Sequence, residues 1–129
     1  MISKTAENYL CAIYSLMNEK GFARPKDLTQ ILEVSSASVT EMLQKLDRQQ
    51  LINYEKRGSV TLTEKGEELA SHSWLRHDTF RKLLVLAGVS PEKAYLEASR
   101  IKHNLSDESV TKLLSLVELL ENHGGSNAR

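Results

Sequence analysis

Residues 24–63 constrain the fold most strongly, because they combine two short amphipathic helices with a small β-hairpin. Arg24-Pro25 marks the start of a helix that we expect to run to about Glu33, since a helix tolerates proline in its first turn. A break at residues 34–36 ends this helix, and Ser35 or Ser36 can cap a second one by accepting a backbone hydrogen bond. The second helix carries one apolar face, made by Val39, Met42, Leu43 and Leu46.

The opposite face of this second helix is small and polar at its N-terminal end. Such a face can enter the major groove of DNA, where hydroxyl groups bind phosphates or base edges. Residues 51–54 and 60–63 then alternate apolar and polar around Lys56, Arg57 and Gly58, which predicts a hairpin with a basic tip. Helix, turn, helix and hairpin in this order predict a winged helix-turn-helix that binds DNA.

The residues that we predict to contact DNA lie at the start of the first of these helices, on the polar face of the second, and at the hairpin tip. They are Arg24, Lys26, Ser36, Ala37, Ser38, Thr40, Glu41, Gln44, Lys45, Lys56 and Arg57. Glu41 is unusual beside phosphates. It can accept a hydrogen bond from a cytosine amino group, or it can pair with Lys45 one turn later.

The composition is that of an ordinary globular chain, with 129 residues, 40% hydrophobic and 26% charged. A net charge of zero argues against a non-specific coating of nucleic acid, whereas a local basic face suffices for a specific site. The sequence has no apolar run near the ~20 residues of a membrane span and no signal-peptide pattern. The single cysteine, Cys11, excludes an internal disulfide. We therefore expect a cytoplasmic protein with no membrane partner.

Helical patterns occupy the rest of the chain, so we expect a mostly α fold. One helix covers residues 3–20, and a long helix capped by Thr63 runs to about Leu86. Ser90 should cap the next helix with its hydroxyl, and Ser106 the last. We expect a winged helix-turn-helix DNA-binding domain at 1–71, a helical dimerisation domain at 72–123 and a disordered tail at 124–129.

Apolar side chains on the last two helices are too many for one neighbour to cover. The buried series of the first of these helices should be Ala94, Ala98, Ile101 and Leu105, and Leu116 and Leu119 widen the apolar stripe of the second. Such a belt is typical of a symmetric helical dimer interface. A homodimer would place two reading helices about one turn of double-stranded DNA apart, as a palindromic operator requires.

Short matches to one known family of regulators are spread along nearly the whole chain. They are Glu7 with Tyr9, Ile13-Tyr14, residues 19–24, Ser38-Val39-Thr40, residues 44–47, Tyr54-Glu55-Lys56, Arg57-Gly58, Leu62-Thr63, Lys65-Gly66, Arg76-His77, Gly88-Val89, and His103 followed by Leu105-Ser106. The chain thereby resembles the manganese- and iron-responsive repressors related to the diphtheria toxin repressor, most closely the manganese transport regulator branch. The resemblance implies the short form of this family, without an SH3-like third domain.

The resemblance also implies a divalent metal site that controls DNA binding. The ligand positions of the family fall on Asn8, Cys11, His77, Ser99, Lys102 and His103, of which only the two histidines fit the manganese pattern. Manganese prefers oxygen ligands, and carboxylates are expected at the other four positions. A Lys102 ammonium ~4 Å from the metal would repel it by ~4 kcal/mol at an intermediate effective dielectric. We therefore expect that the manganese site does not form.

Three interpretations of this altered site remain open. In the first, Lys102 stands where the cation stood and bonds to Asn8, Ser99 or a backbone carbonyl, so that no cofactor is needed. In the second, Cys11, His77 and His103 bind zinc or another softer divalent metal. In the third, Cys11 is a redox or thiol sensor whose thiolate is favoured by Lys102.

The sequence thus predicts a homodimeric, sequence-specific DNA-binding repressor of the metalloregulator type with a degenerate manganese site. The alternative is a winged-helix protein-interaction adaptor that no longer binds DNA. An enzyme is not expected, because no third orienting group accompanies Cys11 and a histidine.

Overall fold

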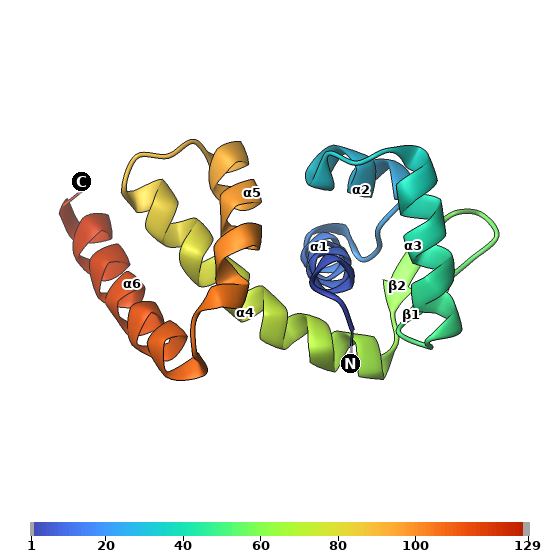
Figure 1. Ribbon diagram of the computed structural model, residues 1–129. Coiled ribbons are helices and arrows are strands. Elements are labelled where there is room, and N and C mark those ends of the chain that lie inside the picture. The colour runs from blue at the N-terminus through green and yellow to red at the C-terminus, as the bar shows by residue number, and fades with distance from the viewer. Residues whose placement is uncertain (1, 128–129) are drawn as a thin grey trace. The chain divides into compact units, whose positions relative to one another are not determined.

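The computed structural model describes residues 2–127, with side chains up to residue 123, and it divides into two compact units between Trp74 and Leu75 (Figure 1). The first unit contains α1 (Lys4–Lys20), α2 (Pro25–Leu32), α3 (Ser36–Arg48), β1 (Ile52–Tyr54), β2 (Val60–Leu62) and the first half of α4 (Glu64–Leu86). The second contains the rest of α4, α5 (Pro91–Ile101), the 3₁₀ turn η1 (Lys102–Asn104) and α6 (Asp107–Asn127). The predicted mostly α fold with a winged helix-turn-helix is confirmed.

Helix caps lie where short polar side chains and glycine predict them. The hydroxyl of Ser3 accepts a hydrogen bond from the Ala6 amide at 3.1 Å, and that of Ser35 accepts one from Ser38 at 3.1 Å. Gly21 ends α1 with a φ of 89°, a left-handed conformation that costs glycine little. Thr63 accepts from Gly66 at 3.1 Å and so begins α4. These contacts fix the ends of the helices around the predicted DNA-binding segment.

The caps of the second unit agree with the sequence only in part. The hydroxyl of Ser106 accepts from the Ser109 amide at 3.2 Å, as expected. Ser90 occupies the N-cap position of α5, but its hydroxyl makes no capping hydrogen bond within the described residues, so that prediction was wrong. Pro91 follows Ser90 and has no N–H to satisfy, which reduces the number of donors that a cap must serve.

The core of the first unit is apolar and continuous from α1 to the hairpin. Its largest fully buried side chains are Leu10, Ile13, Leu28, Val39, Leu43, Leu46, Leu51, Ile52 and Val60. Burying each such side chain contributes about 1.5–3 kcal/mol. The core therefore holds α3 by three of its four predicted apolar residues, while Met42 is only partly buried.

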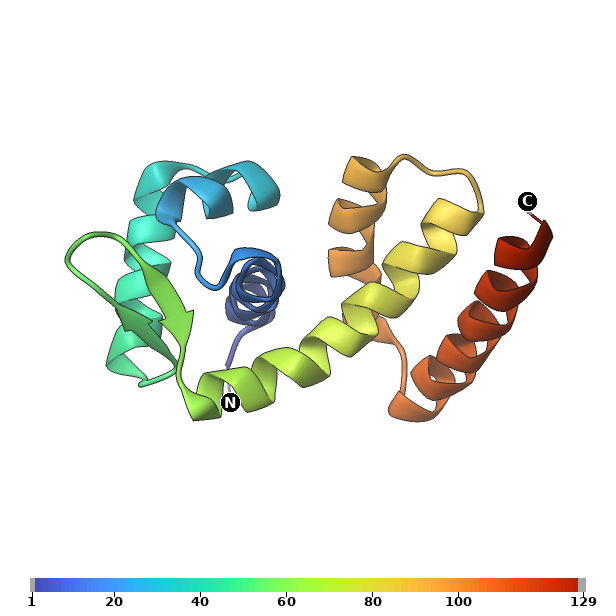
Figure 2. The ribbon, with the colours of Figure 1, turned by 180° about the vertical axis from the view of Figure 1, so that it is seen from behind.

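The hairpin is joined to the rest of the first unit by backbone pairing. Antiparallel β1 and β2 set Ile52 opposite Leu62 and Tyr54 opposite Val60, and Figure 2 shows the pair beside α3. Ala23, in the loop between α1 and α2, exchanges two hydrogen bonds with Val60, at 2.9 and 2.8 Å. The loop that precedes α2 thus pairs with β2 as a short third strand would.

The second unit buries a different face of residues 94–105 from the one predicted. Ala94 and Ala98 are buried, but Ile101 and Leu105 are 38% and 39% exposed, while Lys102 is only 1% exposed. The buried positions Ala94, Ala98 and Lys102 are spaced by four residues, so they form one stripe of α5 that continues into η1, and Ile101 at the end of α5 lies beside that stripe. The predicted burial of Ile101 and Leu105 was therefore wrong.

The last helix exposes a row of large apolar side chains. Leu116, Leu119 and Leu120 are 44%, 53% and 42% exposed, whereas Val110 and Val117 are buried. The backbone of α6 continues through Asn127, where we expected a disordered tail from residue 124, and residues 128–129 of that tail lie outside the described part of the chain. Across residues 2–127, none of the helices combines the length and the apolar character needed to span a bilayer.

Gly66 provides a test of how α4 begins. A Cβ at this position would overlap the carbonyl oxygen of Leu51, which is itself held by the Thr63 amide at 3.1 Å. We expect Gly66→Ala to lower the free energy of unfolding by about 2–3 kcal/mol through overpacking, although alanine is favoured over glycine by about 1 kcal/mol in an open helix. Urea unfolding followed by circular dichroism checks this, with exposed Glu67→Ala as the control. A stabilised Gly66→Ala protein would contradict the close contact.

Candidate nucleic-acid interface

The polar face of α3 is open to solvent. Ser36, Ala37, Ser38, Thr40, Glu41, Gln44 and Lys45 are all exposed, while the opposite face packs in the core. The capping hydroxyl of Ser35 also donates to the Ser38 hydroxyl at 3.0 Å, which orders the first turn. In the described part of the chain, no ion pair joins Glu41 to Lys45, so the expected local pairing is not formed. Both charges are therefore presented on this face.

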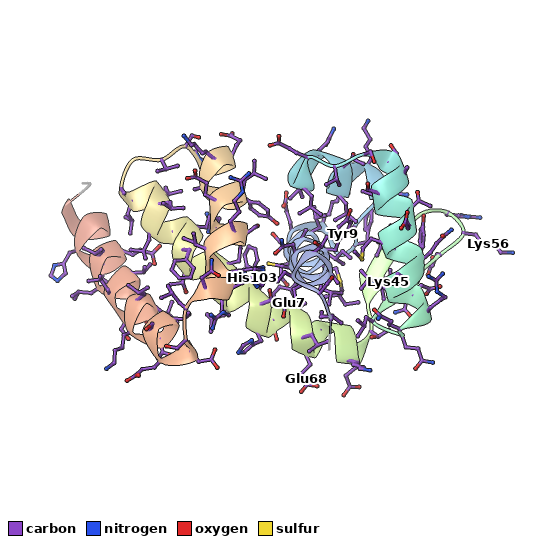
Figure 3. The ribbon with its side chains drawn as sticks, in the orientation of Figure 1. Glu7, Tyr9, Lys45, Lys56, Glu68 and His103 are labelled. Carbon is purple, nitrogen blue, oxygen red and sulfur yellow. The ribbon has the colours of Figure 1, made fainter. Side chains whose placement is uncertain are left out.

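The tip of the wing is a tight turn that carries two cations. The Gly58 amide donates to the Glu55 carbonyl at 2.8 Å, and the Glu55 amide donates to the Ser59 carbonyl at 3.0 Å. Gly58 has a φ of 86°, which a side chain would disfavour. Lys56 and Arg57 are exposed, and Figure 3 shows Lys56 at the end of the loop, directed away from the unit. The predicted basic tip is thus accessible.

The start of α2 brings a third group of charges to the wing. Asp27 forms an ion pair with Lys20 at 2.8 Å and accepts from the Arg24 amide at 3.0 Å. The hydrogen bond from Lys20, followed by that from the Arg24 backbone, holds the pKa of the Asp27 carboxyl below its usual range. Nη1 of Arg24 donates to the Arg57 carbonyl at 3.4 Å, and Lys26 is exposed. Arg24 therefore joins α2 to the wing.

A hollow of about 390 Å³ lies between α1 and α3 on this polar side. Its lining residues are Thr5, Tyr9, Val34, Ser38, Glu41, Met42, Lys45 and Arg48. Sequence reasoning omitted Thr5 and Arg48 from the predicted interface. Helical spacing could have indicated Arg48, because it follows Glu41 and Lys45 by seven and three residues and so shares their face.

The six positions that the family resemblance assigns to metal ligands are divided between the two units. Asn8 and Cys11 are on α1 of the first unit, where Cys11 is a buried free thiol. The second unit holds His77, Ser99, Lys102 and His103, and Figure 3 shows His103 near the end of α5. No group of three His, Cys, Asp or Glu side chains within either unit, over the described residues, could hold a metal ion.

His77 is a fully buried histidine on α4. Its Nε2 lies 2.9 Å from the Tyr95 carbonyl, which can only accept, so Nε2 carries the proton and donates. Burial lowers the pKa of His77 to about 4; the bond to Tyr95 opposes this effect, and the charges of Lys102 and Arg81 add to it. The imidazole is therefore neutral at neutral pH.

Lys102 lies in η1, whose backbone is held by Arg76. Nε of Arg76 donates to the Lys102 carbonyl at 2.9 Å, a second nitrogen donates to the Leu105 carbonyl, and a third contact reaches Asp107 at 2.6 Å. The Ser99 hydroxyl donates to the Tyr95 carbonyl at 3.2 Å. The buried ammonium of Lys102 and the hydroxyl of Ser99, which is bonded to Tyr95, are unsuitable as manganese ligands, because neither supplies the anionic oxygen that this ion prefers.

An exposed polar reading helix, a basic wing and a second helical unit define a winged helix-turn-helix transcription regulator. The family pattern described as "Iron dependent repressor, N-terminal DNA binding domain" matches residues 1–60, and "Iron dependent repressor, metal binding and dimerisation domain" matches residues 63–125. The chain belongs to the iron-dependent repressor family. The predicted resemblance is confirmed, and the two modules indicate a homodimer that binds double-stranded DNA and is not an enzyme.

Individual relatives agree with this assignment. The HTH-type transcriptional regulator MntR of Bacillus subtilis (strain 168) is 37% identical over 121 residues, which cover 94% of this chain and 85% of the relative. The solved IdeR of T. acidophilum has a TM-score of 0.72 at 28% identity and covers 96% of this chain. ScaR with bound Zn²⁺ has a TM-score of 0.57 at 32% identity and covers 88%. This chain spans 56% and 53% of those two solved chains.

The lowered pKa of His77 predicts a specific dependence of stability on pH. Because the folded pKa of about 4 lies below the usual histidine pKa of 6.5, the neutral form is favoured on folding, and the stabilisation is complete above about pH 6.5. It should fall by about 3 kcal/mol as the pH drops through this range toward 4.

Urea unfolding in chelator, at several pH values and one protein concentration, checks this prediction. His77→Gln should flatten the slope of unfolding free energy against pH, whatever its effect on stability at neutral pH. His72→Gln, on the exposed part of the same helix, is the matched control. An unchanged slope in His77→Gln would show that other groups govern the loss of stability in acid.

Proposed function

We propose that this protein is a cytoplasmic repressor that binds a palindromic operator as a homodimer, and that manganese does not occupy the metal position of the family. The observation that carries the second part is the buried ammonium of Lys102 beside a neutral His77. The first part rests on the family and on the exposed polar face of α3 together with the basic wing.

In the DNA complex, α3 lies in the major groove and the wing lies along the backbone. Ser36, Ala37, Ser38 and Thr40 are small enough to let the first turns approach base edges, while Gln44 and Lys45 reach phosphates further along the helix. Arg24, Lys26, Lys56 and Arg57 neutralise phosphates on the wing side. Glu41 is without an ion-pair partner among the described residues, so its carboxylate can accept a hydrogen bond from a cytosine amino group.

The electrostatics of the second unit support control without manganese. The Lys102 charge contributes to the lowered pKa of His77, so it already acts against a proton on that ring. A divalent ion on the same ring would meet a stronger repulsion, ~4 kcal/mol per unit charge at ~4 Å and an intermediate dielectric. The ammonium of Lys102 thus replaces the cation, and no cofactor is needed for DNA binding.

Zinc or another softer metal is the second candidate, and one observation favours it. His77 donates Nε2–H to a backbone carbonyl, which is how metal-binding histidines are commonly oriented. Its neutral state at neutral pH also suits a ligand. This candidate uses the nitrogen ligands of His77 and His103 with the thiol of Cys11. Redox sensing by Cys11 is a third candidate, and it predicts that a small thiol oxidant such as hydrogen peroxide changes DNA binding.

Metal dependence is tested with a duplex selected from a random library by the purified protein. Metal content is measured first, and binding is then followed by fluorescence anisotropy in chelator and after adding manganese, iron or zinc. We expect equal affinity in all conditions for wild type, and weaker binding of Lys102→Met. Loss of binding in chelator, restored by micromolar manganese, overturns the proposal. Restoration by zinc alone, absent in Cys11→Ala, selects the zinc candidate.

The DNA-binding surface is tested by removing three cations. Replacing Lys45, Lys56 and Arg57 with alanine should abolish specific retardation of the selected duplex and reduce the slope of log affinity against log salt by about 2–3, near 0.9 per lost phosphate contact. The matched control replaces Lys93 and Lys112, exposed in the second unit, with alanine. Unchanged retardation by the triple variant supports the protein-interaction adaptor instead.

A further inference from the structure

The ring of Phe22, in the loop that joins α1 to α2, lies close to two cations. The Nζ atom of Lys20 lies 5.2 Å from the centroid of the Phe22 ring, and the guanidinium carbon of Arg24 lies 5.0 Å from it. Both distances fall within the range of cation–π attraction. Phe22 is half-buried, so the ring is neither a core residue nor a free surface side chain.

The backbone on both sides of Phe22 is fixed. Gly21 ends α1 in a left-handed conformation, and Ala23 exchanges two hydrogen bonds with Val60 while its side chain is fully buried. Successive residues in an extended segment point to opposite sides, so Phe22 and Arg24 both lie opposite the buried Ala23. The pairing that anchors the wing therefore also brings the ring and the guanidinium together.

The two cations have different remaining capacity. Lys20 is already in an ion pair with Asp27 at 2.8 Å. Arg24 uses one of its five N–H donors on the Arg57 carbonyl at 3.4 Å, and its side chain is exposed. The face of the Phe22 ring and the Arg57 carbonyl hold the Arg24 side chain, and its other four N–H donors are not used in these two contacts. Those donors match the oxygens of a phosphate.

We propose that Phe22 is a positioning residue of the DNA interface, and that it holds the Arg24 guanidinium for a backbone phosphate between α2 and the wing. This inference rests on the proposed DNA-binding function. Without the ring, the Arg24 side chain would sample other rotamers. The positive charges of Lys56 and Arg57 would also repel its guanidinium. Phe22 acts through Arg24 and does not itself touch the nucleic acid.

A double-mutant cycle on the selected duplex tests the proposal with the full chain. Phe22→Leu should weaken binding about two- to five-fold, the range of one exposed cation–π contact, and should reduce the salt slope. Phe22→Tyr keeps the ring face and should bind as wild type does. In an Arg24→Ala background, Phe22→Leu should have no further effect. In a Lys45→Ala background, the same change should keep its full effect.

Each outcome is decisive. Equal weakening by Phe22→Leu in the Arg24→Ala and wild-type backgrounds overturns the positioning role. Binding by Phe22→Tyr that is as weak as that of Phe22→Leu overturns it as well. Circular dichroism and the unfolding midpoint of each variant show whether a loss reflects folding, and a folded Phe22→Leu protein with wild-type affinity also refutes the proposal. If wild type selects no duplex at all, the proposed DNA-binding function fails and not this inference alone.

Discussion

Two backbone hydrogen bonds between Ala23 and Val60 fix the wing of the first unit to the loop before α2, and both segments carry predicted DNA contacts. They join the first residue of β2 to the loop before α2, so the wing is held by backbone pairing on both of its sides. The apolar core below it fixes α3 through Val39, Leu43 and Leu46. Because both elements share one support, the polar face of α3 and the basic tip keep a constant spacing on a rigid scaffold, which limits the ordering cost of binding.

The second unit buries Lys102, a residue type that is rarely found in a protein interior. Lys102 is 1% exposed, and Arg76 secures the turn that contains it by bonding to the Lys102 and Leu105 carbonyls. A buried charge is expensive unless it is compensated, so the interactions around Lys102 must offset its lost hydration. The neutral His77 is consistent with that environment, because a second positive charge is disfavoured there.

The sequence predicted the first unit well because its signals are local. Ser35, Thr63 and Gly21 each specify a helix end by a contact within a few residues, and the alternation around Gly58 specifies the hairpin. It failed at Ile101 and Leu105 because the buried stripe of Ala94 and Ala98 continues four residues on to Lys102, and a hydrophobic pattern does not assign a buried position to a lysine. Arg24 was predicted as a DNA contact, but its bond to Arg57 and its stacking on Phe22 depend on long-range pairing that periodicity does not encode.

The buried ammonium of Lys102 also has an evolutionary consequence. Lysine and glutamate codons differ by a single base, so one mutation exchanges a cation for a carboxylate at this position. The same holds for asparagine and aspartate at position 8. Cys11 and Ser99 are further from any acidic codon. Single-base changes at positions 8 and 102 would therefore place two carboxylates at positions that the resemblance assigns to metal ligands, without altering the core or the helix caps of the first unit.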